Sequence, residues 1–85
     1  MKHASRPGIV SRLKRAHGHL ASVIAMFEDE RSCLDLAQQL HAVDNAISNA
    51  KRELIRDHIE HCLEDGNGSD TRETIAELKQ LAKYL

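Results

Sequence analysis

The feature that most constrains the fold is the stretch from Cys33 to Cys62, which contains no glycine and no proline. Apolar or small residues recur along it at alternating steps of four and three: Leu36, Leu40, Val43, Ile47, Ala50 and Leu54. This spacing is typical of a coiled-coil seam along one helix. Ser32 can cap the start of that helix, with Asp35 as the capping-box acid. The stretch predicts a long helix over residues 33–64.

Two shorter helices are expected on either side. Residues 8–28 repeat the four-three spacing, interrupted by Gly18, which permits close helix contact or lies on the surface. A capping box at Asp70 and Glu73 predicts a helix over 70–84, after a glycine-rich loop. Residues 1–7 are expected to form a flexible tail. The fold class is therefore all-α, with a three-helix protomer and one domain over residues 1–85.

The chain is too small to bury three apolar stripes alone. Its 85 residues favour oligomerisation, and a bundle shared between chains is expected. No apolar run approaches the ~20 residues that span a membrane, and the N-terminus lacks the apolar core of a signal peptide. Two cysteines are too few for a disulfide scaffold. We therefore expect a cytoplasmic protein with free thiols and no membrane partner.

The ends of the long helix carry thiols and an imidazole. His58 and Cys62 are four positions apart and share a face. Cys33 lies roughly 38 Å from His58 on a straight helix, so one copy of the helix cannot bring both to one metal. An antiparallel pair of identical helices places Cys33 of one chain beside His58 and Cys62 of the other. A site that uses all three residues requires at least a dimer.

Thiolates and an imidazole suit Cu(I), Zn(II) or Ni(II). Two thiolates and one imidazole favour Cu(I), which accepts three ligands, whereas Zn(II) takes a fourth. His3, His61 or water are candidates for that position. The alternative is structural: a free cysteine is commonly a small buried hydrophobe, and a lone helical histidine commonly lies on the surface.

The charge is unevenly distributed along a chain of net charge -1. Residues 1–19 contain no acid and five basic residues: Lys2, Arg6, Arg12, Lys14 and Arg15. They form either a phosphate-binding surface or a solvated helix face. The chain has no Gly-rich phosphate loop and no nucleophile elbow. We therefore expect no enzyme and no small-molecule substrate.

Three motifs resemble a known family, over nearly the whole chain. The segment from Arg12 to Leu20 is similar to its R-[LIV]-x-R-x-x-G-[HQ] opening. Cys33, the segment from Gln38 to Val43, and the segment from Asp57 to Cys62 follow in the family's order and spacing. This pattern resembles the CsoR/RcnR family of metal-sensing transcriptional repressors.

The resemblance implies an antiparallel dimer with a four-helix bundle, assembled into a disc-like tetramer. It implies that the metal-free form binds operator DNA and that the inducer weakens this binding. Copper members use Cys, His and Cys at the positions of Cys33, His58 and Cys62, which indicates a copper sensor. Glu77 matches an acid that orients the histidine. Arg12 matches a basic position of the DNA surface; a second aligns with Asn49, where Lys51 or Arg52 is expected to substitute.

Several alternatives remain open at this point. A Ni(II) or Co(II) sensor would use His3 as an added ligand, because such members carry an extra nitrogen ligand near the N-terminus. A sensor of persulfide or formaldehyde would respond through thiol chemistry. A copper storage or chaperone bundle would bind metal but not DNA.

Overall fold

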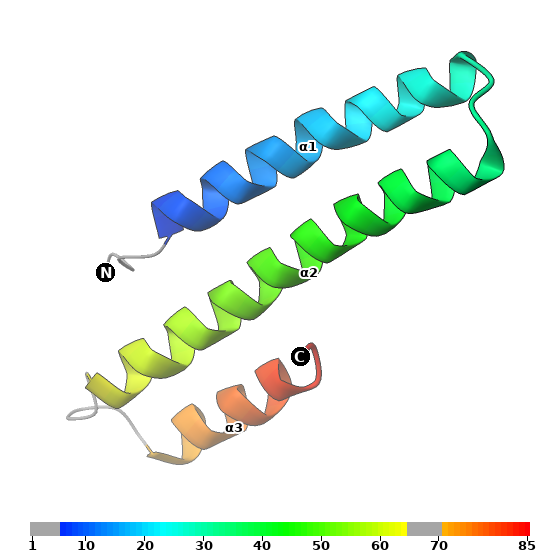
Figure 1. The fold of residues 1–85 in the computed structure, drawn as a ribbon. Helices are drawn as coiled ribbons and strands as arrows, with labels where there is room; N and C mark the ends of the chain where they lie inside the picture. The colour runs from blue at the N-terminus through cyan, green and yellow to red at the C-terminus, as the bar shows by residue number, and fades with distance from the viewer. Residues whose placement is uncertain (1–5, 65–70) are drawn as a thin grey trace.

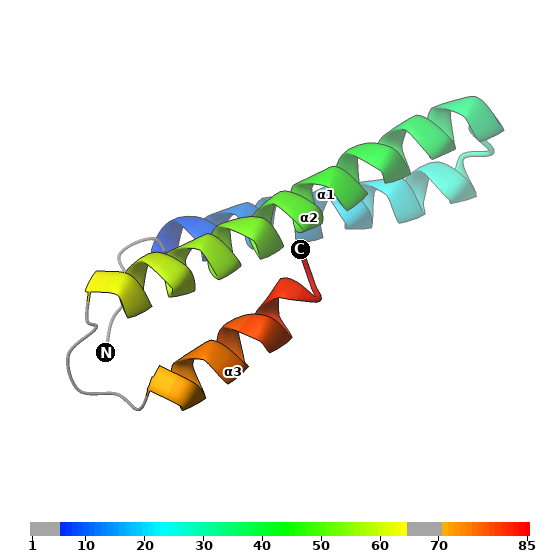
Figure 2. The ribbon, with the colours of Figure 1, turned by 90° about the horizontal axis from the view of Figure 1, so that it is seen from below.

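Three helices make up the fold that the computed structural model describes for residues 6–64 and 71–85. They are α1 (Arg6–Glu28), α2 (Cys33–Glu64) and α3 (Thr71–Ala82), and these residues contain no strand. Helices α1 and α2 form a long antiparallel hairpin, and the shorter α3 lies along the C-terminal half of α2 (Figures 1 and 2). The predicted all-α, three-helix protomer is confirmed. No described helix is both long and apolar enough to cross a membrane.

Helix α2 begins where the capping residue predicts. The Asp35 amide donates a hydrogen bond to Ser32 Oγ at 3.1 Å, and the Leu36 amide donates to the Ser32 carbonyl at 3.0 Å. Ser32 is therefore the N-cap. The helix then continues without interruption for 32 residues, or about 48 Å. Cys33 and His58 thus lie near opposite ends of one straight element.

The predicted bounds of the other two helices need correction. Helix α1 begins at Arg6, so the predicted tail over residues 1–7 is wrong at Arg6 and Pro7. A proline is tolerated in the first turn because its missing N–H would have no helical acceptor there. Helix α3 ends at Ala82, and Tyr84 continues in a tighter turn, its amide donating to the Leu81 carbonyl at 3.0 Å. Lys2, His3 and the loop at 65–70 lie outside the described residues.

A tight turn joins α1 to α2 and determines the geometry of the hairpin. The Arg31 amide donates to the Met26 carbonyl and the Glu30 amide to the Phe27 carbonyl, each at 3.3 Å. This pairing is a Schellman motif, which requires a left-handed residue after the helix. Glu30 takes that conformation with a φ of 57°. The turn reverses the chain within a few residues and places Cys33 directly at the start of α2.

The packing divides each apolar seam into two rows. Alternate seam residues are buried between α1 and α2: Ile9, Ala16 and Val23 from α1, and Leu36, Val43 and Ala50 from α2. The other row stays exposed, and we call it the open row: Leu13, Leu20, Phe27, Leu40, Ile47 and Leu54. A coiled-coil seam normally buries both rows. One protomer therefore buries only one of the two rows of apolar residues that its sequence contains.

The shape of the protomer shows why the open row is uncovered. Its radius of gyration is 17.4 Å, against about 12 Å for a compact domain of this length. Its extents are 56 × 23 × 13 Å, and the smallest is close to the diameter of one helix. The hairpin is thus one helix thick. Because stable domains pack at least two layers around a core, the exposed open row favours cover by further helices.

A substitution at Gly18 tests whether this position of α1 is exposed to solvent. A Cβ added there would meet no atom within 4 Å, so the surface interpretation holds within the protomer. We expect Gly18→Ala to raise the free energy of unfolding by roughly 0.5–1 kcal/mol, because alanine has the higher helix propensity. Urea denaturation followed by circular dichroism measures the change. A loss of stability would show that another chain packs against this position.

Candidate functional site

The C-terminal end of α2 brings a thiol and an imidazole together. Cys62 Sγ lies 3.4 Å from His58 Nε2, and both side chains are half-buried. The contact follows from the helix, since residues four apart lie one above the other on the same face. Both cysteines are free thiols. The pair already has the close approach that two ligands of one metal ion need.

Helix α3 adds a carboxylate to this cluster. Glu77 Oε1 lies 2.9 Å from His58 Nε2, and the His58 side chain is only 24% exposed. A carboxylate held against an imidazole fixes the ring orientation. Glu77 therefore lies beside His58. The same contact also joins α3 to α2.

The remaining predicted ligands lie elsewhere. Cys33 is exposed at the opposite end of α2. Within residues 6–64 and 71–85, no three His, Cys, Asp or Glu side chains are grouped to hold a metal ion. His61 is half-buried beside the cluster, and His3 lies outside the described residues. One protomer thus brings together His58, Cys62 and Glu77, but not Cys33.

The donor chemistry of the cluster fits a thiophilic metal. A thiolate and an imidazole are ligands that Cu(I), Zn(II) and Ni(II) all accept, and a second thiolate shifts the preference to Cu(I). Two donors from one chain fall short of the three or four that these ions require. A metal site here needs further ligands, which the described residues do not group with this pair.

The basic residues of α1 form an exposed surface. Arg6, Arg12, Lys14 and Arg15 are all exposed, and α1 contains no acidic residue before Glu28. The two basic candidates of α2, Lys51 and Arg52, are exposed as well. Uninterrupted positive charge on one helix is a suitable surface for nucleic-acid phosphates.

A groove of about 290 Å³ lies between α1 and α2, in the middle of the hairpin. Its lining residues are Arg12, Arg15, Ala16 and His19 from α1 and Ala46 and Asn49 from α2. His19 also joins the two helices, because its Nε2 donates to Gln39 Oε1 at 2.7 Å. His19 and Asn49 are absent from the predicted site residues. The three- and four-residue steps from Arg12 to Arg15 to His19 are the signal for a shared face.

Comparison with known proteins extends these observations. The family model described as metal-sensitive transcriptional repressor matches residues 5–84. The copper-sensing transcriptional repressor CsoR of Bacillus subtilis is 36% identical over 76 residues, which cover 88% of this chain and 75% of that protein. CsoR of Mycobacterium tuberculosis is 31% identical over 85 residues, 95% of this chain and 69% of the relative. No solved structure gives a significant match.

A second repressor of Mycobacterium tuberculosis agrees with these matches. The copper-sensing transcriptional repressor RicR is 31% identical over 64 residues, which cover 69% of this chain and 67% of that protein. Together with the all-helical fold, the matches define the class as a metal-sensing transcriptional repressor, a regulator and not an enzyme. The chain belongs to the metal-sensitive transcriptional repressor family, which confirms the resemblance to the CsoR/RcnR repressors.

Proposed function

We propose that this chain is a copper-responsive repressor, which binds operator DNA when metal-free and releases it when Cu(I) binds between two subunits. One observation carries the proposal: His58 and Cys62 lie 3.4 Å apart on a hairpin whose apolar seam is half uncovered. A second copy that covers the open row can also supply the missing thiolate. Relatives named as copper-sensing repressors support the choice of metal.

The register of the open row supports this pairing. Leu40 and Leu54 each lie seven positions from Ile47, so a two-fold axis at Ile47 pairs each leucine with the other in the partner subunit. Cys33 lies fourteen positions before Ile47. The same axis therefore places it opposite position 61, next to Cys62 of the partner subunit. One antiparallel alignment of two α2 helices thus pairs the leucines of the open row and also brings Cys33 close to Cys62 of the partner subunit.

The proposed ligands are Cys33 from one subunit and His58 and Cys62 from the other. Cu(I) is a soft ion that accepts three ligands, and both thiols must lose their protons to bind it. Both Glu77 Oε1 and Cys62 Sγ approach the His58 imidazole at Nε2. In this role Glu77 holds the ring in a fixed orientation. His3 is a ligand only in the nickel or cobalt alternative.

The proposed DNA surface is the basic face of α1, repeated by each protomer. Its members are Lys2, Arg6, Arg12, Lys14 and Arg15, of which Lys2 lies outside the described residues. Contacts of this kind release counterions, so DNA affinity should fall steeply with salt. Phe27 and Tyr84 are the only aromatic residues of the chain, so base stacking has little part in binding.

Metal and DNA are proposed to oppose each other through α2. Ligation ties the start of one α2 to the end of its partner, and this fixes the angle between the two hairpins. DNA phosphates bind α1, which packs along the same α2 helices. When the two ligands favour different angles, each weakens the other, typically by 1–3 kcal/mol for one coupled pair of sites.

The test is an anaerobic titration of Cu(I) into the reduced protein bound to its own upstream DNA. We expect fluorescence anisotropy to report release at about one Cu(I) per chain, as three ligands per ion require. His58→Ala should abolish release, whereas the control His41→Ala, at an exposed position of the same helix, should respond like the wild type.

Other outcomes of this titration contradict the copper proposal in distinct ways. Release by Ni(II), lost in His3→Ala, would identify a nickel sensor. DNA binding indifferent to both metals would leave a sensor of thiol modification. Tight Cu(I) binding without any affinity for DNA would indicate a storage protein.

A further inference from the structure

We propose that His61 is a positioning residue of the metal site, and that its imidazole holds the thiol of the partner subunit's Cys33 beside His58 and Cys62. This inference rests on the proposed copper site and adds one residue to it. In the sequence, His61 is a candidate fourth ligand for Zn(II). In the role proposed here it contacts the thiol and not the ion.

His61 continues the open row of α2. Leu40, Ile47 and Leu54 follow one another at steps of seven residues, and one further step of seven reaches His61. Seven residues make about two helical turns, so these side chains share one side of the helix. His61 is half-buried in the protomer, and α2 extends past it to Glu64. The row therefore ends in an imidazole instead of another aliphatic side chain.

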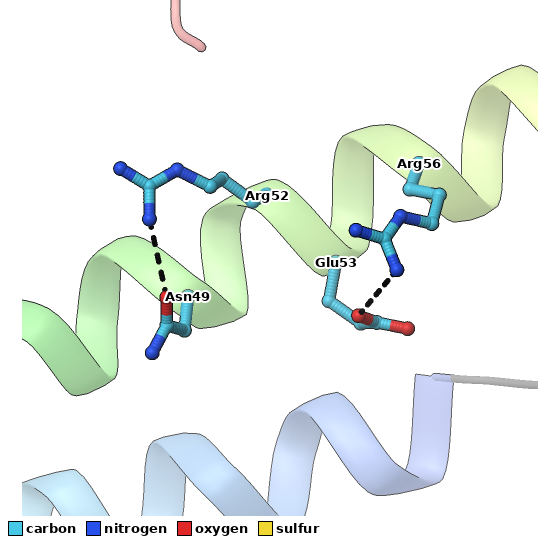
Figure 3. A network of polar contacts seen from close by, with 4 residues as sticks. All are labelled: Asn49, Arg52, Glu53 and Arg56. Carbon is cyan, nitrogen blue, oxygen red and sulfur yellow. Dashed lines mark hydrogen bonds and ion pairs between the residues drawn. The ribbon is translucent and has the colours of Figure 1, made fainter.

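The charged residues of this part of α2 lie on another side of the helix. Arg52 Nη1 donates a hydrogen bond to Asn49 Oδ1 at 3.1 Å. Arg56 Nη1 lies 3.9 Å from Glu53 Oε2 (Figure 3). At about 100° per residue, all four are roughly 100° or more around the helix from the open row. These contacts therefore leave the open row to its apolar side chains and His61.

The proposed two-fold axis at Ile47 brings the partner subunit's Cys33 to His61. Cys33 lies fourteen positions before Ile47 and His61 lies fourteen positions after it, so the axis sets the two opposite each other. Cys62 is one position further along and about 100° around the helix. Of the side chains at this end of α2, His61 therefore faces the incoming thiol most directly.

An imidazole is a suitable partner for this thiol. One of its nitrogens can accept a hydrogen bond from a thiol or donate one to a thiolate. The other two proposed ligands already have such contacts in the protomer: Glu77 lies 2.9 Å from His58, and His58 lies 3.4 Å from Cys62. Cys33 is exposed in the protomer, so its contact comes from the partner in this proposal. Side chains that hold a ligand typically change metal affinity by about 10–100-fold.

The geometry of α2 favours this role for His61 over direct ligation. Within the described parts of the chain, His61 does not join His58 and Cys62 in a group of three donors that could hold a metal ion. The helix explains this, because adjacent residues point about 100° apart. His61 is thus close enough to contact a ligand but is not directed at the ion.

Disulfide trapping tests whether the two residues face each other. In the double variant of His61→Cys and Cys62→Ala, mild oxidation of the metal-free protein should join two chains through Cys33 and the introduced thiol. Residues that face each other across a helix pair come within the Cα distance that a disulfide needs. The control combines Glu60→Cys with Cys62→Ala, which puts the thiol at an exposed position about 100° around the helix. It should give little covalent dimer on a non-reducing gel.

Copper titration tests whether His61 supports the site. His61→Ala should still bind one Cu(I) per chain, but about tenfold more weakly in competition with a chelator. His61→Gln keeps a hydrogen-bonding group and should restore most of the affinity. His41→Ala, at an exposed position of the same helix, should bind like the wild type. X-ray absorption spectroscopy should find the same three ligands in His61→Ala as in the wild type.

Three results would overturn the inference while the copper site stands. They are equal trapping in the two double variants, wild-type Cu(I) affinity in His61→Ala, and loss of a nitrogen ligand from its absorption spectrum, which would make His61 a ligand. Absence of tight Cu(I) binding by the wild-type protein would instead remove the copper site and this inference with it. Circular dichroism of each variant checks that the helices are intact.

Discussion

A mixture of the variants Cys33→Ala and Cys62→Ala should regain copper binding that neither variant has alone. Each pure variant lacks one thiolate in both sites of its dimer, and loss of a ligand from a three-ligand site should abolish tight Cu(I) binding. A mixed dimer combines the intact Cys33 of one chain with the intact His58 and Cys62 of the other. One of its two sites is then complete, and the other lacks both thiolates.

The size of the recovery follows from random pairing. Half of the dimers are mixed and each has one complete site of two, so about one quarter of the wild-type capacity should return. The variants are unfolded together, refolded and titrated with Cu(I) against a competing chelator. No recovery in the mixture would refute a site shared between subunits.

Two further mixtures provide the controls. Cys33→Ala mixed with His58→Ala should recover to the same extent, because the two changes again fall on different halves of the site. Cys62→Ala mixed with His58→Ala should not recover, since both residues come from the same chain of each site. Recovery in all three mixtures would show that the ligands are not divided between subunits in this way, with Cys33 on one chain and His58 and Cys62 on the other.

Ile47→Lys should prevent assembly and, with it, both metal and DNA binding. Ile47 is 47% exposed in the protomer and lies at the centre of the open row, where the proposed two-fold axis pairs it with its own copy. The substitution therefore brings two unpaired ammonium groups together in an apolar interface. A cost of about 4 kcal/mol per dimer would weaken the dimerisation constant roughly a thousandfold.

Sedimentation and circular dichroism at matched concentrations measure this effect. The variant should sediment as a monomer and lose much of its helix signal, since a hairpin one helix thick buries little alone. Asn45→Lys is the matched control: it adds the same charge two residues away, at an exposed position on the opposite side of α2. An Ile47→Lys protein that assembles like the control would show that the open row is not the interface.

Much of the fold could be predicted because local signals decide it. The Ser32 cap predicted the start of α2, and the glycine-rich loop after residue 64 predicted its end. The start of α1 was placed too late because a proline reads as a boundary, although it fits the first turn. The division of each seam into a buried and an open row was not foreseen, because periodicity shows which residues are apolar but not which neighbour covers them.

The candidate sites show the same contrast between local and distant contacts. His58 and Cys62 are neighbours through helix geometry alone, so their spacing was enough to predict their approach. The groove was missed because it joins Arg12 and Asn49, whose alignment depends on the turn at Glu30. The proposed approach of Cys33 to His58 and Cys62 depends on a second chain, so the structure of one protomer does not display it.

The thinness of the hairpin also has a consequence for the lifetime of the protein. Under the proposed pairing, folding and association of this thin hairpin form one equilibrium, so the folded fraction depends on the protein concentration. By mass action, any ion held jointly by two subunits shifts this equilibrium toward the assembled form. Under the proposed mechanism, the metal that releases the repressor from DNA would then also protect it from proteolysis. A pool of released repressor would persist, ready to rebind when the metal is withdrawn.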